Sequence, residues 1–206
     1  MQAIARAALV AALVGMSAGL AGCFTAAATG IVVGGLAAID RRTIGAQTED
    51  QAIELKAHEA LRANQLQGGG ISVTSFNRRV LLSGQAENES VKARATEVVR
   101  GIENVVEVHN ELDIAGRASF GSSVTDTSIT TRVKTALLNS SEVPGNSVKV
   151  VTEKTTVYLM GLVTAAEADA AARIASRTSG VARVVTVFEL ISPEEARRLD
   201  GRASSG

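Results

Sequence analysis

The stretch Ile71–Gly84 (ISVTSFNRRVLLSG) returns 77 residues later as Val148–Gly161 (VKVVTEKTTVYLMG), and this repeat decides the fold. In each copy, alternating apolar side chains lie on either side of a short polar turn, 153–155 in the second copy. This pattern predicts two antiparallel strands. Gly84 and Gly161 end the second strand at equivalent places, which indicates a backbone position that a side chain would disturb.

Helices flank the strands in both copies. The segment 53–61 aligns with 129–137, where Ile129, Val133 and Leu137 repeat at the spacing of one helix face. A second helix is expected at 90–100 and 165–178, the latter starting with a Thr164/Glu167 capping box. Third strands close the copies at 105–114 and 181–190. Each copy therefore reads α-β-β-α-β.

This order predicts an α+β fold, with two helices packed on a three-stranded mixed sheet in each of two tandem domains. We place the domains at 48–115 and 124–191, with a Gly/Ser-rich linker at 116–123. The tail 192–206 is expected to be flexible after a short helix at 193–199.

Composition narrows the possible functions. The 21 Lys and Arg balance the 21 Asp and Glu, so the basic face of a nucleic-acid binder is not expected. One Cys, two His and 2% aromatic residues leave little for a zinc site, acid–base catalysis or a stacking pocket. We therefore expect no cofactor, no metal and no enzymatic activity.

The first 22 residues have the features of an export signal, with Arg6 ahead of an apolar run at 7–19. Leu20-Ala-Gly-Cys23 then matches the bacterial lipobox, which predicts cleavage before Cys23 and acylation of that residue. Several acyl chains would hold the protein firmly, since each buried CH₂ contributes about 0.8 kcal/mol. Phe24, rather than Asp, follows the Cys, which favours the outer membrane.

Residues 23–47 are interpreted as the lipidated Cys and an apolar tether. The apolar part, 25–39, is shorter than the roughly 20 residues needed to span a bilayer. It could lie at the bilayer surface, pack on the folded part, or act as a flexible tether. Asp40-Arg41-Arg42 is expected to return the chain to water.

The two copies resemble the BON domain, a bacterial module with this element order. The residues that carry the resemblance are Val80-Leu-Leu-Ser-Gly84, Val157-Tyr-Leu-Met-Gly161 and Ser179-Gly-Val181. Together with the lipobox and Arg42-Thr-Ile-Gly-Ala-Gln47, they make the chain similar to dual BON-domain outer-membrane lipoproteins.

The resemblance implies a non-enzymatic protein in the periplasm of a Gram-negative bacterium, held on the outer membrane. It implies binding of anionic phospholipids such as phosphatidylglycerol through the first helix of the second domain. It further implies support of envelope integrity and cell division, with activators of cell-wall amidases as possible partners.

The difference in net charge between the two copies also favours lipid binding by the second. Residues 48–115 hold 11 acidic and 7 basic side chains, whereas 124–191 hold 6 and 7, so an anionic bilayer would repel the first copy more. Relatives can carry an aromatic wedge where this chain has Ser128, so either lipid binding is weaker here or another residue supplies the wedge. Phe120 is the candidate for that residue, with a linker aromatic packed on the domain as the alternative. The candidate lipid-binding residues are Phe120, Ser128, Thr131, Arg132, Lys134, Thr135 and Leu138, with an ordinary solvated helix face as the alternative.

Other candidate chemistry is weak. His58 and His109 have no nearby nucleophile in sequence, and Gly68-Gly-Gly70 lacks the Lys-Ser/Thr of a phosphate loop. A lipid-tethered adaptor for proteins of cell-wall remodelling is the second hypothesis, and an envelope hydrolase is the third.

Overall fold

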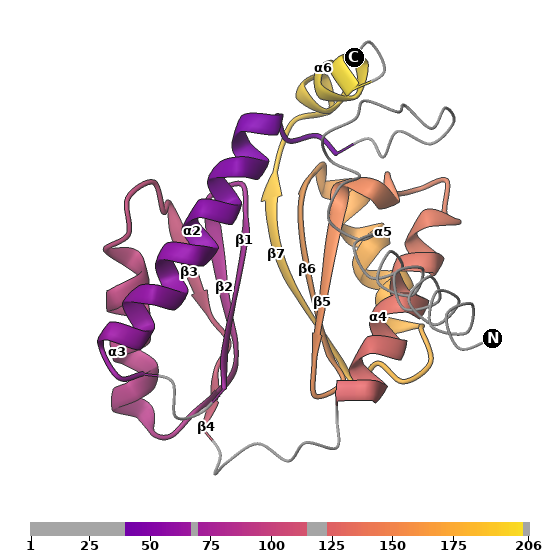
Figure 1. Ribbon diagram of the computed structural model, residues 1–206. Coiled ribbons are helices and arrows are strands. Elements are labelled where there is room, and N and C mark those ends of the chain that lie inside the picture. Colours follow the sequence, from indigo (N-terminus) through magenta and orange to yellow (C-terminus); the bar gives the residue numbers. More distant parts are fainter. Residues whose placement is uncertain (1–39, 67–69, 115–122, 204–206) are drawn as a thin grey trace, which may run out of the picture. The chain divides into compact units, whose positions relative to one another are not determined.

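The computed structural model describes residues 40–66, 70–114 and 123–203. The first domain contains α2 (Ile44–Ala63), β1 (Ile71–Phe76), β2 (Arg79–Ala86), α3 (Glu89–Arg100), β3 (Glu107–Asn110) and β4 (Asp113–Ile114). The second contains α4 (Ser123–Leu138), a short 3₁₀ turn (Gly145–Ser147), β5 (Val148–Glu153), β6 (Thr156–Val163), α5 (Ala165–Ser176) and β7 (Arg183–Leu190). The expected α-β-β-α-β order and α+β class are confirmed in both copies (Figure 1).

Both sheets have the same topology. An antiparallel hairpin, β1–β2 or β5–β6, is extended by a parallel strand, β3 or β7, beside its second strand. The first sheet counts four strands because its last strand is broken: β3 and β4 both pair with β2. At the break, the Asn110 side chain accepts a hydrogen bond from the Leu112 N–H at 3.1 Å, which replaces a ladder bond.

Gly84 and Gly161 do not end β2 and β6, which continue to Ala86 and Val163, but both occupy positions where a side chain would clash, as expected. A Cβ on Gly84 would lie 2.2 Å from the Gly70 carbonyl oxygen, and one on Gly161 would lie 2.7 Å from that of Ser147. Gly84 also has a φ of +100°, a backbone conformation that residues with a side chain rarely adopt. The backbone therefore approaches closely at the same place in both copies.

Three hydrophobic clusters set the order of the layers. One lies between α2, α3 and the first sheet, and another lies between α4, α5 and the second sheet. The third consists of residues on the sheet faces that point away from the helices: Phe76, Leu81, Tyr158, Met160, Leu162 and Val187. The two sheets thus pack on each other, with one helical layer on each outer side (Figure 1).

Two boundaries differ from expectation. The first helix begins at Ile44, four residues before the expected start of the domain, because the Thr43 side chain caps it by accepting the Ala46 N–H. The short helix expected at 193–199 is present as α6 (Pro193–Ala203) and continues into the part of the tail that was expected to be flexible. It buries Ala196 and packs Leu199 on the cluster between the sheets.

Candidate functional site

The candidate residues of the second domain lie on the exposed side of α4. Thr131, Arg132, Lys134, Thr135 and Leu138 are all exposed, as is Ser128. Ile129, Val133 and Leu137 are fully buried on the opposite side. With about 100° between successive helix residues, Thr127, Thr131 and Thr135 form the middle of the exposed side. Arg132 and Lys134 therefore lie on its two flanks.

The hydroxyl groups on this side bond to their own helix. Thr131 Oγ1 donates to the Thr127 carbonyl oxygen at 3.0 Å, and Ser128 Oγ donates to that of Thr125 at 2.9 Å. A hydroxyl that is already bonded costs less to remove from water. The middle of the α4 face is therefore weakly polar and carries no carboxylate, and Leu138, 48% exposed, lies at its end.

Arg132 is held in place by neutral groups. Its Nη1 donates to the Ser179 carbonyl oxygen at 2.6 Å, its Nη2 to Ser128 Oγ at 2.7 Å and its Nε to the Ser128 carbonyl oxygen at 3.2 Å. Gly180 allows this approach, since a Cβ there would lie 3.3 Å from Nη1. Within the described part of the chain, neither Arg132 nor Lys134 forms an ion pair, so both charges remain uncompensated.

The same helix of the first domain presents different chemistry. With the 76-residue offset, Leu55 and Glu59 take the places of Thr131 and Thr135, and Lys56 takes that of Arg132. Lys56 pairs with Glu103 at 3.7 Å, and Glu59 puts a carboxylate in the middle of the exposed side. The copies therefore share a fold but not a surface.

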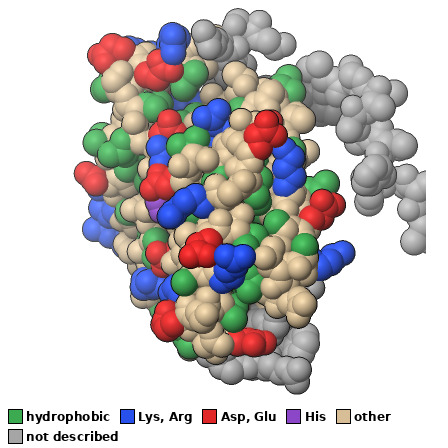
Figure 2. Space-filling model, turned by 90° about the vertical axis from the view of Figure 1, so that its left-hand side faces the viewer, with side chains coloured by type: hydrophobic (Ala, Val, Ile, Leu, Met, Phe, Trp, Pro, Cys, Tyr) green, Lys and Arg blue, Asp and Glu red, His purple; other side chains and the backbone are tan. Residues whose placement is uncertain are grey.

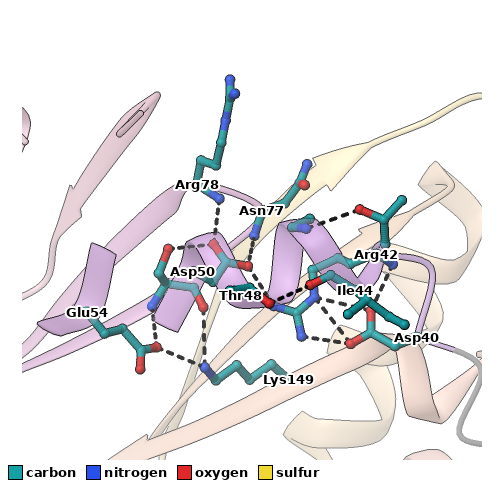
Figure 3. A network of polar contacts seen from close by, with 12 residues as sticks. Asp40, Arg42, Ile44, Thr48, Asp50, Glu54, Asn77, Arg78 and Lys149 are labelled. Carbon is teal, nitrogen blue, oxygen red and sulfur yellow. Dashed lines mark hydrogen bonds and ion pairs between the residues drawn. The ribbon is translucent and has the colours of Figure 1, made fainter. Parts of the chain in front are cut away.

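An aspartate that was not among the predicted site residues anchors the hairpin turn in each copy. Asp50 accepts the backbone N–H groups of Asn77 and Arg78 at 2.7 and 2.8 Å (Figure 3). Its counterpart Asp126 accepts those of Lys154 and Thr155 at 2.8 and 2.9 Å. All four turn residues have positive φ, so each carboxylate stabilises a strained turn. The signal was available, because both aspartates and both turns repeat with the copies.

We expected Arg41 and Arg42 to return the chain to water, but both side chains are bound within the folded part. Arg41 is buried and donates five hydrogen bonds, two each to Glu167 and Asp200 and one to the Leu162 carbonyl oxygen, at 2.7–2.9 Å. Burial alone would lower the pKa of Arg41, but these two carboxylates raise it above its ordinary value. Arg42 instead bonds to Asp40 and Asp50 (Figure 3). Its guanidinium also stacks on the ring of Phe76 of the first domain.

Ion pairs and a hydrogen bond cross between the domains around the apolar cluster. In three ion pairs, a cation of the second domain contacts a carboxylate of the first. In the opposite arrangement, Glu189 of the second domain pairs with Arg79 of the first and accepts a hydrogen bond from the Asn77 side chain. The three pairs of the first kind are Lys149–Glu54 at 3.2 Å, Lys154–Asp113 at 3.8 Å and Arg183–Glu111 at 3.8 Å. These pairs neutralise the basic side chains of the second sheet, so the uncompensated cations of this domain lie on its helical layer.

Other expected features are distributed as follows. Cys23, the apolar tether and Phe120 lie outside the described residues. His109 lies 3.3 Å from Glu107, and its pKa is lowered by burial and by Arg79, against the effect of Glu111. In the described ranges no group of His, Cys, Asp and Glu is arranged to hold a metal ion, and no helix there is long and apolar enough to cross a membrane.

Comparisons with known proteins agree with this architecture. The BON domain profile matches residues 49–116 and 125–191. Outer membrane lipoprotein DolP of Haemophilus influenzae is 39% identical over 184 residues, which cover 88% of this chain and 95% of that protein. The 21 kDa hemolysin of Actinobacillus pleuropneumoniae is 36% identical over 155 residues, covering 74% and 80%.

Among solved structures, the C-terminal domain of CdsD, a structural protein of the type III secretion system of Chlamydia trachomatis, covers 69% of this chain and 67% of its own. Its TM-score is 0.28 and its sequence identity is 17%. The family follows from the two domain matches and from the sequence relatives. The chain belongs to the BON-domain family, as a dual BON-domain, DolP-like outer-membrane lipoprotein.

Proposed function

We propose that this lipoprotein is anchored by acyl chains on Cys23, faces the periplasm, and binds anionic phospholipid through the exposed side of α4. The observation that carries the proposal is the carboxylate-free α4 face with uncompensated Arg132 and Lys134 on its flanks. Flanking cations can reach lipid phosphates while the threonines and Leu138 lie at the headgroup level.

The expected affinity of this face is low. Each basic group near an anionic bilayer contributes about 1 kcal/mol, so two give a weak contact by themselves. A tether to the same membrane raises the local concentration and makes weak binding sufficient. The family resemblance also supports a contribution to envelope integrity and cell division, which we include in the proposal.

The test is co-sedimentation of residues 24–206, made without the signal segment, with vesicles of phosphatidylglycerol or of neutral phosphatidylcholine. We expect binding to the first alone, weakening as salt rises. Thr135→Glu, which installs the residue of the first copy, should weaken binding about fivefold, and Lys134→Glu should weaken it more.

Lys56→Glu is the matched control, since it changes the first-domain counterpart of Arg132. It should leave vesicle binding unchanged. Equal binding to neutral vesicles, or wild-type binding by both Thr135→Glu and Lys134→Glu, would contradict the proposal.

A further inference from the structure

The first domain carries an open groove along α2. It is shallow and open to solvent, with a volume of about 470 Å³. Small and aliphatic side chains share its lining with charged ones. The lining residues are Lys56, Glu59, Ala60, Ala63, Ile102 and Glu103.

The equivalent place in the second domain is occupied. Arg132 corresponds to Lys56 and Ser179 to Glu103, and there the Arg132 guanidinium extends across to the Ser179 carbonyl oxygen. In the first domain, Lys56 reaches Glu103 only at 3.7 Å, and both side chains are well exposed, so this pair holds the groove weakly. This α2 groove is therefore open in the first domain, whereas the Arg132 side chain lies across the equivalent place in the second.

The charge of the α2 groove selects its occupant. Glu59, Glu103 and Lys56 are the charged residues of the lining, so carboxylates outnumber cations there by one. Lys56 is paired with Glu103, whereas Glu59 forms no ion pair within the described residues. The corresponding positions of the second domain, Thr135 and Ser179, are uncharged. The first domain as a whole holds four more acidic than basic side chains, 11 against 7. A cationic segment with apolar side chains is the complementary ligand.

The layers of the molecule place the groove away from the membrane surface that α4 would contact. α2 and α3 form one outer layer, and α4 and α5 form the other, with both sheets between them. A chain that rests on a bilayer through α4 therefore presents the α2 groove to the opposite side. Acidic, basic and apolar side chains are interspersed on this face of the first domain (Figure 2).

We infer that the α2 groove docks a partner protein of the periplasm through a helix whose apolar side is flanked by Lys or Arg. The apolar side chains lie on Ala60, Ala63 and Ile102, and the cations reach Glu59 and Glu103. This interaction is separate from lipid binding, because it uses the other domain and the opposite outer layer.

The test uses residues 24–206 and a fluorescein-labelled helical peptide of about 14 residues, with Leu on one side and Lys on its flanks. Fluorescence anisotropy should show saturable binding, and amide shifts in NMR spectra should map to α2 and to 101–104. A peptide with Glu in place of each Lys should bind at least about tenfold more weakly. Ala63→Arg, which fills the groove with an exposed cation, should reduce binding by a similar factor.

Glu87→Gln, which removes an exposed acid of the same domain outside the groove, is the control and should bind normally. Thr135→Glu should keep peptide binding while its vesicle binding weakens about fivefold, so the two proposals can fail independently. Wild-type affinity of Ala63→Arg, equal binding of the Glu peptide, or shifts that map to α4 would overturn the inference. So would loss of vesicle binding in Ala63→Arg, which would make the groove a membrane surface.

Discussion

At the scale of single residues, two consecutive arginines divide their side chains between the two domains. Arg41 is bound to Glu167 and Asp200 of the second domain and its C-terminal helix, whereas Arg42 is bound to Asp50 of the first. Every N–H of the Arg41 guanidinium is used, so the desolvation of a buried charge is compensated by hydrogen bonds.

Arg41→Gln should lower the free energy of unfolding by about 3 kcal/mol, because it removes a buried cation that donates two hydrogen bonds each to Glu167 and Asp200. Urea denaturation followed by circular dichroism measures this change. Arg62→Gln, at an exposed arginine of α2, is the control and should change stability little. A loss in Arg41→Gln no larger than the control loss would show that this ion pair contributes nothing.

The same cluster makes stability depend on acid. Burial would raise the pKa of Glu167, but hydrogen bonds from Arg41 and the Thr164 backbone outweigh it and hold that pKa below the ordinary 4.5. A carboxylate whose pKa is lower in the folded than in the unfolded protein stabilises the fold at pH values above its unfolded-state pKa. This stabilisation is lost as the pH falls through the folded-state pKa. In urea titrations from pH 7 to pH 3, the midpoint concentration of urea should therefore decrease once the pH is below about 4.5. Glu167→Gln should flatten this slope, and an unchanged slope would assign it to other acids.

At the scale of the element, the hairpin with its helix-borne aspartate is the unit that repeats. Among the described residues, Asp126 bonds only to the turn, but Asp50 also accepts the Ser75 hydroxyl at 2.7 Å and pairs with Arg42 at 2.7 Å. The first copy has thus added two contacts to an anchor that both copies share.

This difference predicts an order of stabilities. Asp126→Ala should cost about 2 kcal/mol, since it removes two hydrogen bonds to a charged acceptor, and Asp50→Ala should cost more. Asp169→Ala, at an exposed acid of α5, serves as the control in the same urea titrations. If Asp50→Ala costs no more than Asp126→Ala, the extra contacts of Asp50 do not stabilise the protein.

The elements themselves could be predicted because their signals are local. Periodic apolar residues placed the helices and strands of both copies, and the Thr164/Glu167 box located the start of α5. The periodicity of apolar residues does not assign Asp50 and Arg41, since the turn that Asp50 anchors lies 27 and 28 residues away and the partners of Arg41 lie 121 to 159 residues away. For Asp50 the usable signal was the repeat of the aspartate and its turn in both copies. The exposed side of α4 was predicted as a candidate site. The position of the Arg132 side chain could not be predicted, because it depends on a hydrogen bond to the Ser179 carbonyl oxygen, 47 residues away.

At the scale of the whole molecule, the packing of sheet on sheet had a signal that sequence analysis did not use. Val157-Tyr-Leu-Met160 is apolar at successive positions rather than alternate ones, which is typical of a strand that is buried on both faces. Val157 and Leu159 face the helices, while Tyr158 and Met160 face the first domain. A small domain with helices on one side of its sheet has to cover the other side, and here its duplicate does so.

The shared cluster predicts that the two domains unfold together. Leu81 is fully buried between the sheets, and Leu81→Glu would place a carboxylate there without a partner, so the domains should separate. The wild type should then show one calorimetric transition, whereas the variant should show two and a larger radius of gyration in small-angle scattering. Val106→Glu, at an exposed aliphatic residue of the first domain, is the control and should keep the single transition. A single transition and an unchanged radius in Leu81→Glu would mean that the ion pairs around the cluster hold the domains together without it.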